Sequence, residues 1–116
     1  MEGFFEFGSP FIEVDVEKRK IKMLLDTGFN GHLMLPSSTI QEIGMDTIGI
    51  SDYKTASGDV KITKVYLAKI LFFDENIEVP VLSNESDIFL AGMELFKNCR
   101  IVMEIKHNLV DITKSD

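Results

Sequence analysis

The residues of this chain best suited to chemistry are the triplet Asp26-Thr27-Gly28. A stretch that is apolar at four of five positions, residues 21–25, runs directly into the carboxylate, and apolar residues resume at 33–36. Placing a charged group among apolar side chains costs free energy unless it has hydrogen-bond or charge partners. Carboxylates with a shifted pKa are concentrated at functional sites. Asp26 is therefore the leading candidate for acid–base chemistry. The structural alternative is an aspartate that closes a strand end as an Asx turn.

The triplet occurs only once in the chain, and this affects the chemistry it can support. Hydrolysis of amides by carboxylates uses two carboxyl groups that share a proton, one activating water and the other polarising the carbonyl. A two-fold symmetric dimer would bring Asp26 of each subunit to the axis, and this is the commonest oligomer symmetry. Two carboxyls so close would titrate as a coupled pair. A catalytic Asp26 therefore implies a homodimer.

Composition limits the remaining possibilities. The length of 116 residues and a hydrophobic content of 45% fit a single domain, 1–116, with a substantial core. A net charge of −7, with acidic and basic residues interleaved, argues against a nucleic-acid partner. No stretch approaches the length of a membrane span, and the N-terminus lacks the basic and continuous apolar segments of a signal peptide. We expect a cytoplasmic protein without a membrane partner.

Cysteine and histidine usage argues against disulfide and metal chemistry at the site. Cys99 is the only cysteine, so no intrachain disulfide or thiolate zinc cluster is possible. We expect it to be a small core residue. The spacing of His32 and His107 does not indicate a metal site, and His32 is expected to be an exposed strand residue. The sequence predicts no metal and no cofactor.

Hydrophobic periodicity predicts a chain made mainly of β-strands. Residues 11–16 alternate strictly and form a hairpin with 21–25, which we expect to be buried on both sides. A long hairpin is expected from strands over 48–55 and 60–72, turning at 56–59. Further strands are expected at 31–35, 77–82, 101–105 and 109–112, a short helix after Pro36 that ends near Gly44, and a helical turn or two over 93–98. Pro80 suggests that its strand lies at an edge.

Two segments resemble the signatures of single-domain, retropepsin-like aspartic proteases, and this version is similar to prokaryotic members. They are LLDTGFNG at 24–31 and IFLAGM at 88–93, in the order that the family has them. The resemblance covers nearly the whole chain. It implies a mainly β, retropepsin-like closed β-barrel, the acid protease fold, with one or two short helices. It also implies that Gly92 packs behind the catalytic loop.

The resemblance assigns roles to individual residues. Asp26 would be the catalytic acid and base, the Thr27 hydroxyl would join a hydrogen-bond network that locks the two loops of the dimer, and Gly28 would let backbone approach the carboxyl. Asn30 would bind substrate backbone, although an Asn before Gly is equally typical of a turn.

The residues at the tip of the long hairpin occupy the place of the family's flap. Ala56, Ser57 and Gly58, followed by Asp59, would close over an extended peptide. The alternative is an ordinary solvent-exposed hairpin tip.

Together these expectations predict a homodimeric aspartic endopeptidase that acts on peptide or protein substrates. The alternative from another class is a catalytically silent dimeric peptide-binding or scaffolding module with the same fold. A third possibility is a processing domain that acts on one partner only.

Overall fold

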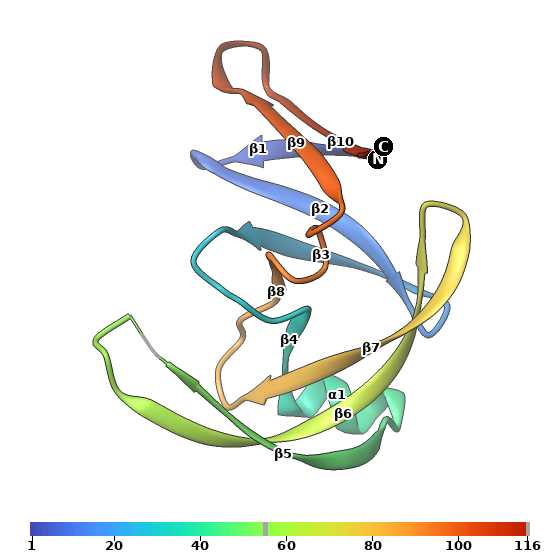
Figure 1. The fold of residues 1–116 in the computed structure, drawn as a ribbon, viewed down its shortest axis with the longest axis vertical. Helices are drawn as coiled ribbons and strands as arrows, with labels where there is room; N and C mark the ends of the chain where they lie inside the picture. The colour runs from blue at the N-terminus through green and yellow to red at the C-terminus, as the bar shows by residue number, and fades with distance from the viewer. Residues whose placement is uncertain (55, 116) are drawn as a thin grey trace.

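The computed structural model describes residues 1–54 and 56–115. Thr55, which ends the first predicted strand of the long hairpin, lies outside the described residues. The described part of the chain contains the following elements, shown in Figure 1: β1 (Glu2–Glu6), β2 (Ser9–Val16), β3 (Arg19–Asp26), β4 (Leu33–Pro36), α1 (Ser37–Ile43), β5 (Asp46–Lys54), β6 (Val60–Phe72), β7 (Glu75–Asn84), β8 (Leu90–Gly92), β9 (Cys99–Glu104), the short 3-10 helix η1 (Ile105–His107) and β10 (Leu109–Lys114). The expectation of a mainly β chain with one or two short helices is confirmed.

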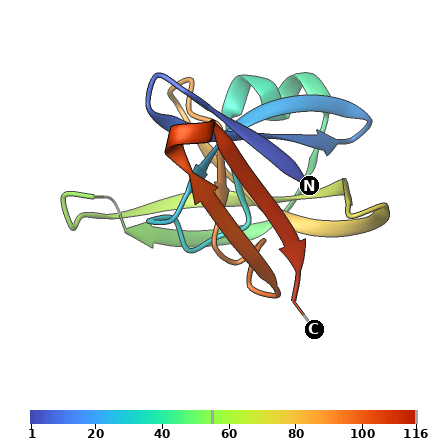
Figure 2. The same cartoon turned by 90° about the horizontal axis from the view of Figure 1, so that it is seen from above.

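The strands form one sheet in the order β5-β6-β7-β4-β8-β3-β2-β1-β10-β9. An additional pairing of β2 with β6 makes a ring of six strands, and only two residue pairs close that ring, Asp15 with Leu71 and Val16 with Ile70. Figure 1 shows β1, β9 and β10 at one end of the molecule and the β5–β6 hairpin at the other. Figure 2, seen from above, shows β9 and β10 in front and the β5–β6 hairpin pointing out to one side. The hairpin therefore reaches away from the terminal strands.

The core lies inside this ring because the strands alternate apolar and polar residues. Ile12, Val14 and Val16 of β2 are buried on one face, whereas Glu13 is exposed on the other, as period-two alternation requires. α1 covers part of the core with Ile40 and ends at Gly44, which adopts the left-handed conformation and whose N–H bonds the Ile40 carbonyl. The short predicted helix is thus present.

The prediction that β3 is buried on both sides is wrong. Met23 and Leu25 are buried, Leu24 is half-buried, and Lys22 is exposed and bonds Glu6 at 2.8 Å. One face of β3 therefore packs on the core and the other stays open, and an uncovered face at Leu24 leaves room beside Asp26.

The prediction of an edge position for Pro80 is also wrong. β7 lies between β6 and β4, and Pro80 pairs with Leu67 of β6. Pairing with β4 begins only at Val81, opposite Leu33. On that side the proline therefore has no strand partner, so a residue without an N–H is tolerated inside the sheet.

Residues 93–98, expected to form a helical turn or two, form successive turns that are not part of a helix. The Leu95 and Phe96 amides donate to carbonyls three residues earlier, Gly92 and Met93, at 3.2 and 3.1 Å. The two amides before them, of Met93 and Glu94, are used by a different part of the chain, the loop that follows Asp26. The start of this segment is therefore bound to that loop.

Candidate active site

Asp26 is the last residue of β3 and is paired in parallel with Gly92 of β8. Its Oδ1 accepts a hydrogen bond from the Gly28 N–H at 2.9 Å, and its carbonyl accepts one from Phe29 at 3.2 Å. The Asx turn is therefore present, but it uses only one carboxylate oxygen. Oδ2 makes no hydrogen bond with the described residues, so the half-buried carboxyl keeps an oxygen for other chemistry.

Thr27 and Gly28 lie at the outer side of this turn and are exposed. The Thr27 hydroxyl makes no hydrogen bond to any residue in the described ranges, 1–54 and 56–115. A Cβ at Gly28 would lie 3.3 Å from Oδ1 of Asp26, a close contact at the atom that the turn holds. Glycine therefore allows the N–H to reach the carboxylate.

The loop after Asp26 is bound from behind by three consecutive amides. The Gly92 N–H donates to the carbonyl of His32 at 2.9 Å, Met93 to Phe29 at 2.8 Å, and Glu94 to Gly31 at 3.2 Å. These bonds connect the two sequence signatures directly. The position of the Asp26 carboxyl therefore depends on a segment more than sixty residues further along the chain.

Gly92 has no room for a side chain. A Cβ there would meet the Gly31 carbonyl oxygen and would lie 2.7 Å from the Phe29 carbonyl oxygen and 2.5 Å from Cδ2 of the Phe29 ring. Two of these contacts are to backbone, which cannot move aside as a flexible side chain can. Glycine is therefore required for the loop to approach β8 this closely.

Asp26 lines a groove of about 1140 Å³. Next to it on the same face of β3 is Leu24, because residues two apart in a strand point to the same side. Leu24 is in register with Leu90 of β8, and Leu90 with Met34 of β4. All three side chains line the groove. The carboxyl thus lies beside an apolar row that crosses three strands.

The β5–β6 hairpin forms the opposite wall of this groove. Lys54 and Ala56 line the groove together with Asp26, so the base of the hairpin tip and the carboxyl border the same groove. Ser57 and Gly58 lie at the exposed tip and are not among the lining residues, and Gly58 adopts a positive φ of 91°. Of the predicted flap residues, the structure therefore brings only Ala56 to the groove.

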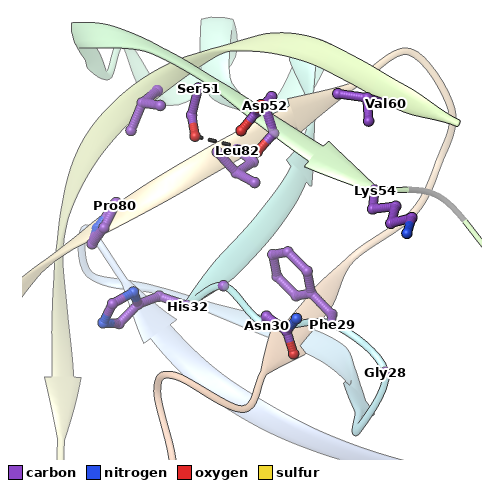
Figure 3. Close-up of a pocket in the computed structure, with 12 residues that line it drawn as sticks. Gly28, Phe29, Asn30, His32, Ser51, Asp52, Lys54, Val60, Pro80 and Leu82 are labelled. Atoms are coloured by element: carbon purple, nitrogen blue, oxygen red, sulfur yellow. Dashed lines mark hydrogen bonds between the residues drawn. The ribbon is translucent and has the colours of Figure 1, made fainter. Parts of the chain in front are cut away.

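A second cavity of about 460 Å³ lies between the loop after Asp26 and the hairpin (Figure 3). Phe29, Asn30 and His32 line it from the loop, and Leu82 lines it from β7. Asn30 therefore faces a cavity rather than open solvent alone. Sequence reasoning missed Phe29 and Leu82, because an apolar residue in a strand or loop gives no signal that it lines a cavity.

His32 is half-buried and not the exposed strand residue that was expected. Burial lowers the pKa of its imidazole from the ordinary value of 6.5, the negative charge of Glu94 opposes this effect, and Lys97 adds to it. Lys97 bonds the Glu94 carboxylate at 3.0 Å and thereby lowers the pKa of that carboxyl. Burial thus favours the uncharged form of the His32 imidazole.

Cys99 packs against the core, and burial raises the pKa of its thiol. In the described ranges, no three His, Cys, Asp or Glu residues are grouped so that they could hold a metal ion. No helix in the same ranges is long and apolar enough to cross a membrane.

In this structure an Asp-Thr-Gly turn ends a strand, and the segment that begins at Gly92 bonds the loop after that turn. These features are typical of retropepsin-like aspartic proteases. The family described as "gag-polyprotein putative aspartyl protease" matches residues 12–98. The chain belongs to this family.

Solved structures share the fold. A retropepsin-like aspartic protease from Rickettsia conorii is 22% identical, with a TM-score of 0.68 over 99% of this chain and 89% of that chain. EIAV protease complexed with an inhibitor is 16% identical, with a TM-score of 0.65 over 77% and 86%. Simian foamy virus protease is 21% identical, with a TM-score of 0.57 over 75% and 91%. A comparison with curated proteins found no match.

The contact between Gly92 and the loop predicts the effect of Gly92→Ala. Because the added Cβ meets two carbonyl oxygens, we expect the free energy of unfolding to fall by roughly 2 kcal/mol or more. Urea denaturation at a fixed protein concentration measures this loss. Gly49→Ala is the matched control, since a Cβ at Gly49 meets nothing within 4 Å. Equal effects of the two substitutions would contradict the close packing described above.

The burial of His32 predicts a pH dependence. Since its pKa is lower in the folded than in the unfolded state, the unfolded state binds more protons just below pH 6.5. The contribution of His32 to stability is therefore complete above that pH and is lost as pH falls through the folded pKa. NMR titration of the imidazole should give a midpoint below 6.5, and Glu94→Gln should lower it further. A midpoint at or above 6.5 would disprove the assigned burial effect.

Proposed function

We propose that the protein is a homodimeric aspartic endopeptidase in which Asp26 and its counterpart from a second copy hydrolyse peptide bonds. The observation that carries the proposal is the placement of Asp26. Its carboxyl lines a groove, is fixed through one oxygen by Gly28, and belongs to a chain of an aspartic protease family. One carboxyl group alone lacks the second proton-transfer partner that this chemistry needs.

In the proposed reaction the two carboxyls share one proton. The ionised carboxylate takes a proton from a water held between the two groups, and the protonated carboxyl donates a hydrogen bond to the scissile carbonyl. Water adds to the carbonyl carbon while the carbonyl oxygen takes the proton of the neutral carboxyl. The carboxyl that took the water proton then gives it to the amine nitrogen, and a hydroxyl of the intermediate returns a proton to the other carboxylate as the C–N bond breaks. The reaction requires neither an acyl-enzyme nor a metal.

Polar groups of the Asp26-Thr27-Gly28 turn that lack partners within one chain support a dimer. Oδ2 of Asp26 and the hydroxyl of Thr27 have no hydrogen-bond partner in the described part of one chain. In a two-fold dimer both would face their counterparts, and Thr27 would join the hydrogen-bond network between the two loops. Such a network is what holds two carboxyls close enough to share a proton.

An extended peptide fits the walls of the groove. Backbone pairing of β6 with β7 stops at Val65, and the Thr63 hydroxyl still bonds Ser83 of β7. Residues 60–62 of β6 therefore pair with β5 alone within the described chain. This leaves a strand edge beside the groove, and an extended peptide can add to such an edge through main-chain hydrogen bonds. We assign Ala56, Ser57 and Gly58 to a flap that closes over the peptide.

Two further parts of the proposed site would contact the substrate. The apolar row that begins at Leu24 lies next to the carboxyl and would receive an apolar side chain beside the scissile bond. Asn30 lines the smaller cavity, and Phe29 lines both that cavity and the groove. The Asn30 side-chain amide would donate a hydrogen bond to the peptide backbone. A peptide held in this way would pass between the hairpin and the row.

A catalytically silent dimeric peptide-binding module is the second candidate. One observation favours it, since Oδ1 of Asp26 closes an Asx turn with Gly28 and so has a structural role whether or not the carboxyl reacts. In such a module the groove and the free edge of β6 would bind peptide without turnover.

Asp26→Asn separates the two candidates. Asparagine keeps an oxygen that can accept the Gly28 hydrogen bond, so we expect the fold to persist while peptide cleavage falls by at least roughly a thousandfold. Cleavage of a diverse peptide library from about pH 4 to pH 7 measures the loss, because a shared proton requires one carboxyl ionised and the other not. Asp46→Asn, exposed and outside both cavities, is the matched control. Absence of cleavage by all three proteins, with dimers present, would favour the binding module.

The dimer is tested by mixing wild-type and Asp26→Asn chains. If each active site needs two Asp26 carboxyls, an equal mixture that exchanges subunits holds only about a quarter of its dimers in the active form. Activity should then be about half that of the wild-type chains alone, and specific activity should fall on dilution. Activity strictly proportional to the amount of wild-type chain, at every concentration, would indicate a site complete in one chain.

A further inference from the structure

The groove that holds Asp26 is lined by three lysines, Lys54, Lys61 and Lys64. All three are exposed, and none forms an ion pair with a described residue. Elsewhere Lys22 and Lys97 bond glutamates at 2.8 and 3.0 Å. The fold therefore leaves the groove cations available to a ligand.

The local charge differs from that of the whole protein. The chain carries a net charge of −7, yet the charged residues lining the groove are the three lysines against Asp26 and Glu85. Glu85 is bonded by Ser37 at 3.2 Å. Asp52 lines the smaller cavity together with Lys54, and Asp59 bonds Ser57 at the hairpin tip. Neither carboxylate forms an ion pair with a described lysine. Charges of one sign in a cleft raise the local concentration of oppositely charged ligands.

The lysines flank the free edge of β6 on both of its faces. Lys61 and Lys64 are three residues apart in β6, so their side chains point to opposite faces of the hairpin. Lys54 is paired with Val60 and therefore shares a face with Lys64. An extended peptide along residues 60–62, which precede the Thr63 bond to β7, would also place successive side chains on alternate faces. An acidic residue of that peptide would meet a lysine on either face.

We propose that the groove selects extended peptides that carry Asp or Glu close to an apolar residue. The apolar row beginning at Leu24 takes the apolar side chain, and Lys54, Lys61 and Lys64 pair with the carboxylates. The assignment of the apolar residue to the cleavage position rests on the proposed protease function. The preference for acidic peptides is a property of binding and is measurable without turnover.

The test uses three fluorescent peptides with the same apolar centre and with Glu, Gln or Lys in the flanking positions. Binding to Asp26→Asn protein, followed by fluorescence anisotropy, avoids cleavage during the measurement. We expect the Glu peptide to bind roughly tenfold more tightly than the Gln peptide and the Lys peptide most weakly. The difference should shrink in about 0.5 M salt because the charges are exposed.

Charge reversal gives a matched control. Lys61→Glu with Lys64→Glu, added to the same Asp26→Asn protein, should invert the order of the three peptides. Lys20→Glu with Lys106→Glu changes the net charge by the same amount, 2 × −2 = −4, at exposed lysines outside the groove, and should keep the order. An inversion in both variants would assign the effect to overall charge and overturn the proposal.

Two further outcomes separate this proposal from the protease assignment. Equal dissociation constants for the Glu and Lys peptides, or no binding of any peptide, would overturn the acidic preference. Cleavage of the three peptides by the wild-type protein at equal kcat/KM would keep the protease function and reject the preference. A preference in binding together with no cleavage by the wild-type protein would keep the selective groove and reject the protease function.

Discussion

The structure of the site depends on the close approach of two backbones, the loop 29–32 and the segment that begins at Gly92. Three amide-to-carbonyl hydrogen bonds join them, and the absence of a Cβ at Gly92 makes the approach possible. The loop is thereby held at both ends, by β3 before it and by β8 behind it. The position of Asp26 at the end of a paired strand, with its Oδ1 bonded to Gly28, follows from this arrangement.

The groove has two walls with different physical character. The floor, formed by β3, β8 and β4, presents in-register leucine and methionine side chains above a buried core. The hairpin wall is more exposed, since Ile50 and Ile62 of β5 and β6 have 74% and 77% of their surface accessible. Apolar side chains so exposed on a hairpin are a feature of surfaces that contact another molecule. The strands β3, β8 and β4 position the Asp26 carboxyl. The hairpin carries the exposed apolar side chains and the lysines that are proposed to select a peptide.

Local patterns predicted much of this architecture. Strict alternation located β2, turn residues located the hairpin tip, and an apolar strand leading into Asp26 located the candidate site. The failures have a common cause in pairing between distant segments. The position of Pro80 depends on where β4 begins to pair, and the first two amides of 93–98 bond carbonyls of the loop at 29–32.

Assembly of the groove could not be inferred from the sequence either. The row from Leu24 through Leu90 to Met34 exists only because three strands share one register, and no spacing in the chain encodes that register. The same holds for Lys54 and Lys64, which share a face through the pairing of β5 with β6. Asp26 could be chosen as a candidate from its neighbours in the sequence, whereas the residues around it in space required the three-dimensional structure.

The ring of six strands has a seam, the place where β2 meets β6. Two residue pairs and the bonds between Glu17 and Lys69 form this seam, while β6 and β7 are joined to each other over eight pairs. The layer made of β5, β6 and β7 is thus internally strong and weakly attached along one side. Regions with few connections open at a lower free energy than the core around them. Two residue pairs at the seam and four pairs of β7 with β4 join this layer to the rest of the ring, fewer in total than the eight that join β6 to β7. Separation of the layer from the rest of the ring would therefore break fewer strand pairings at the seam than at the β4–β7 side.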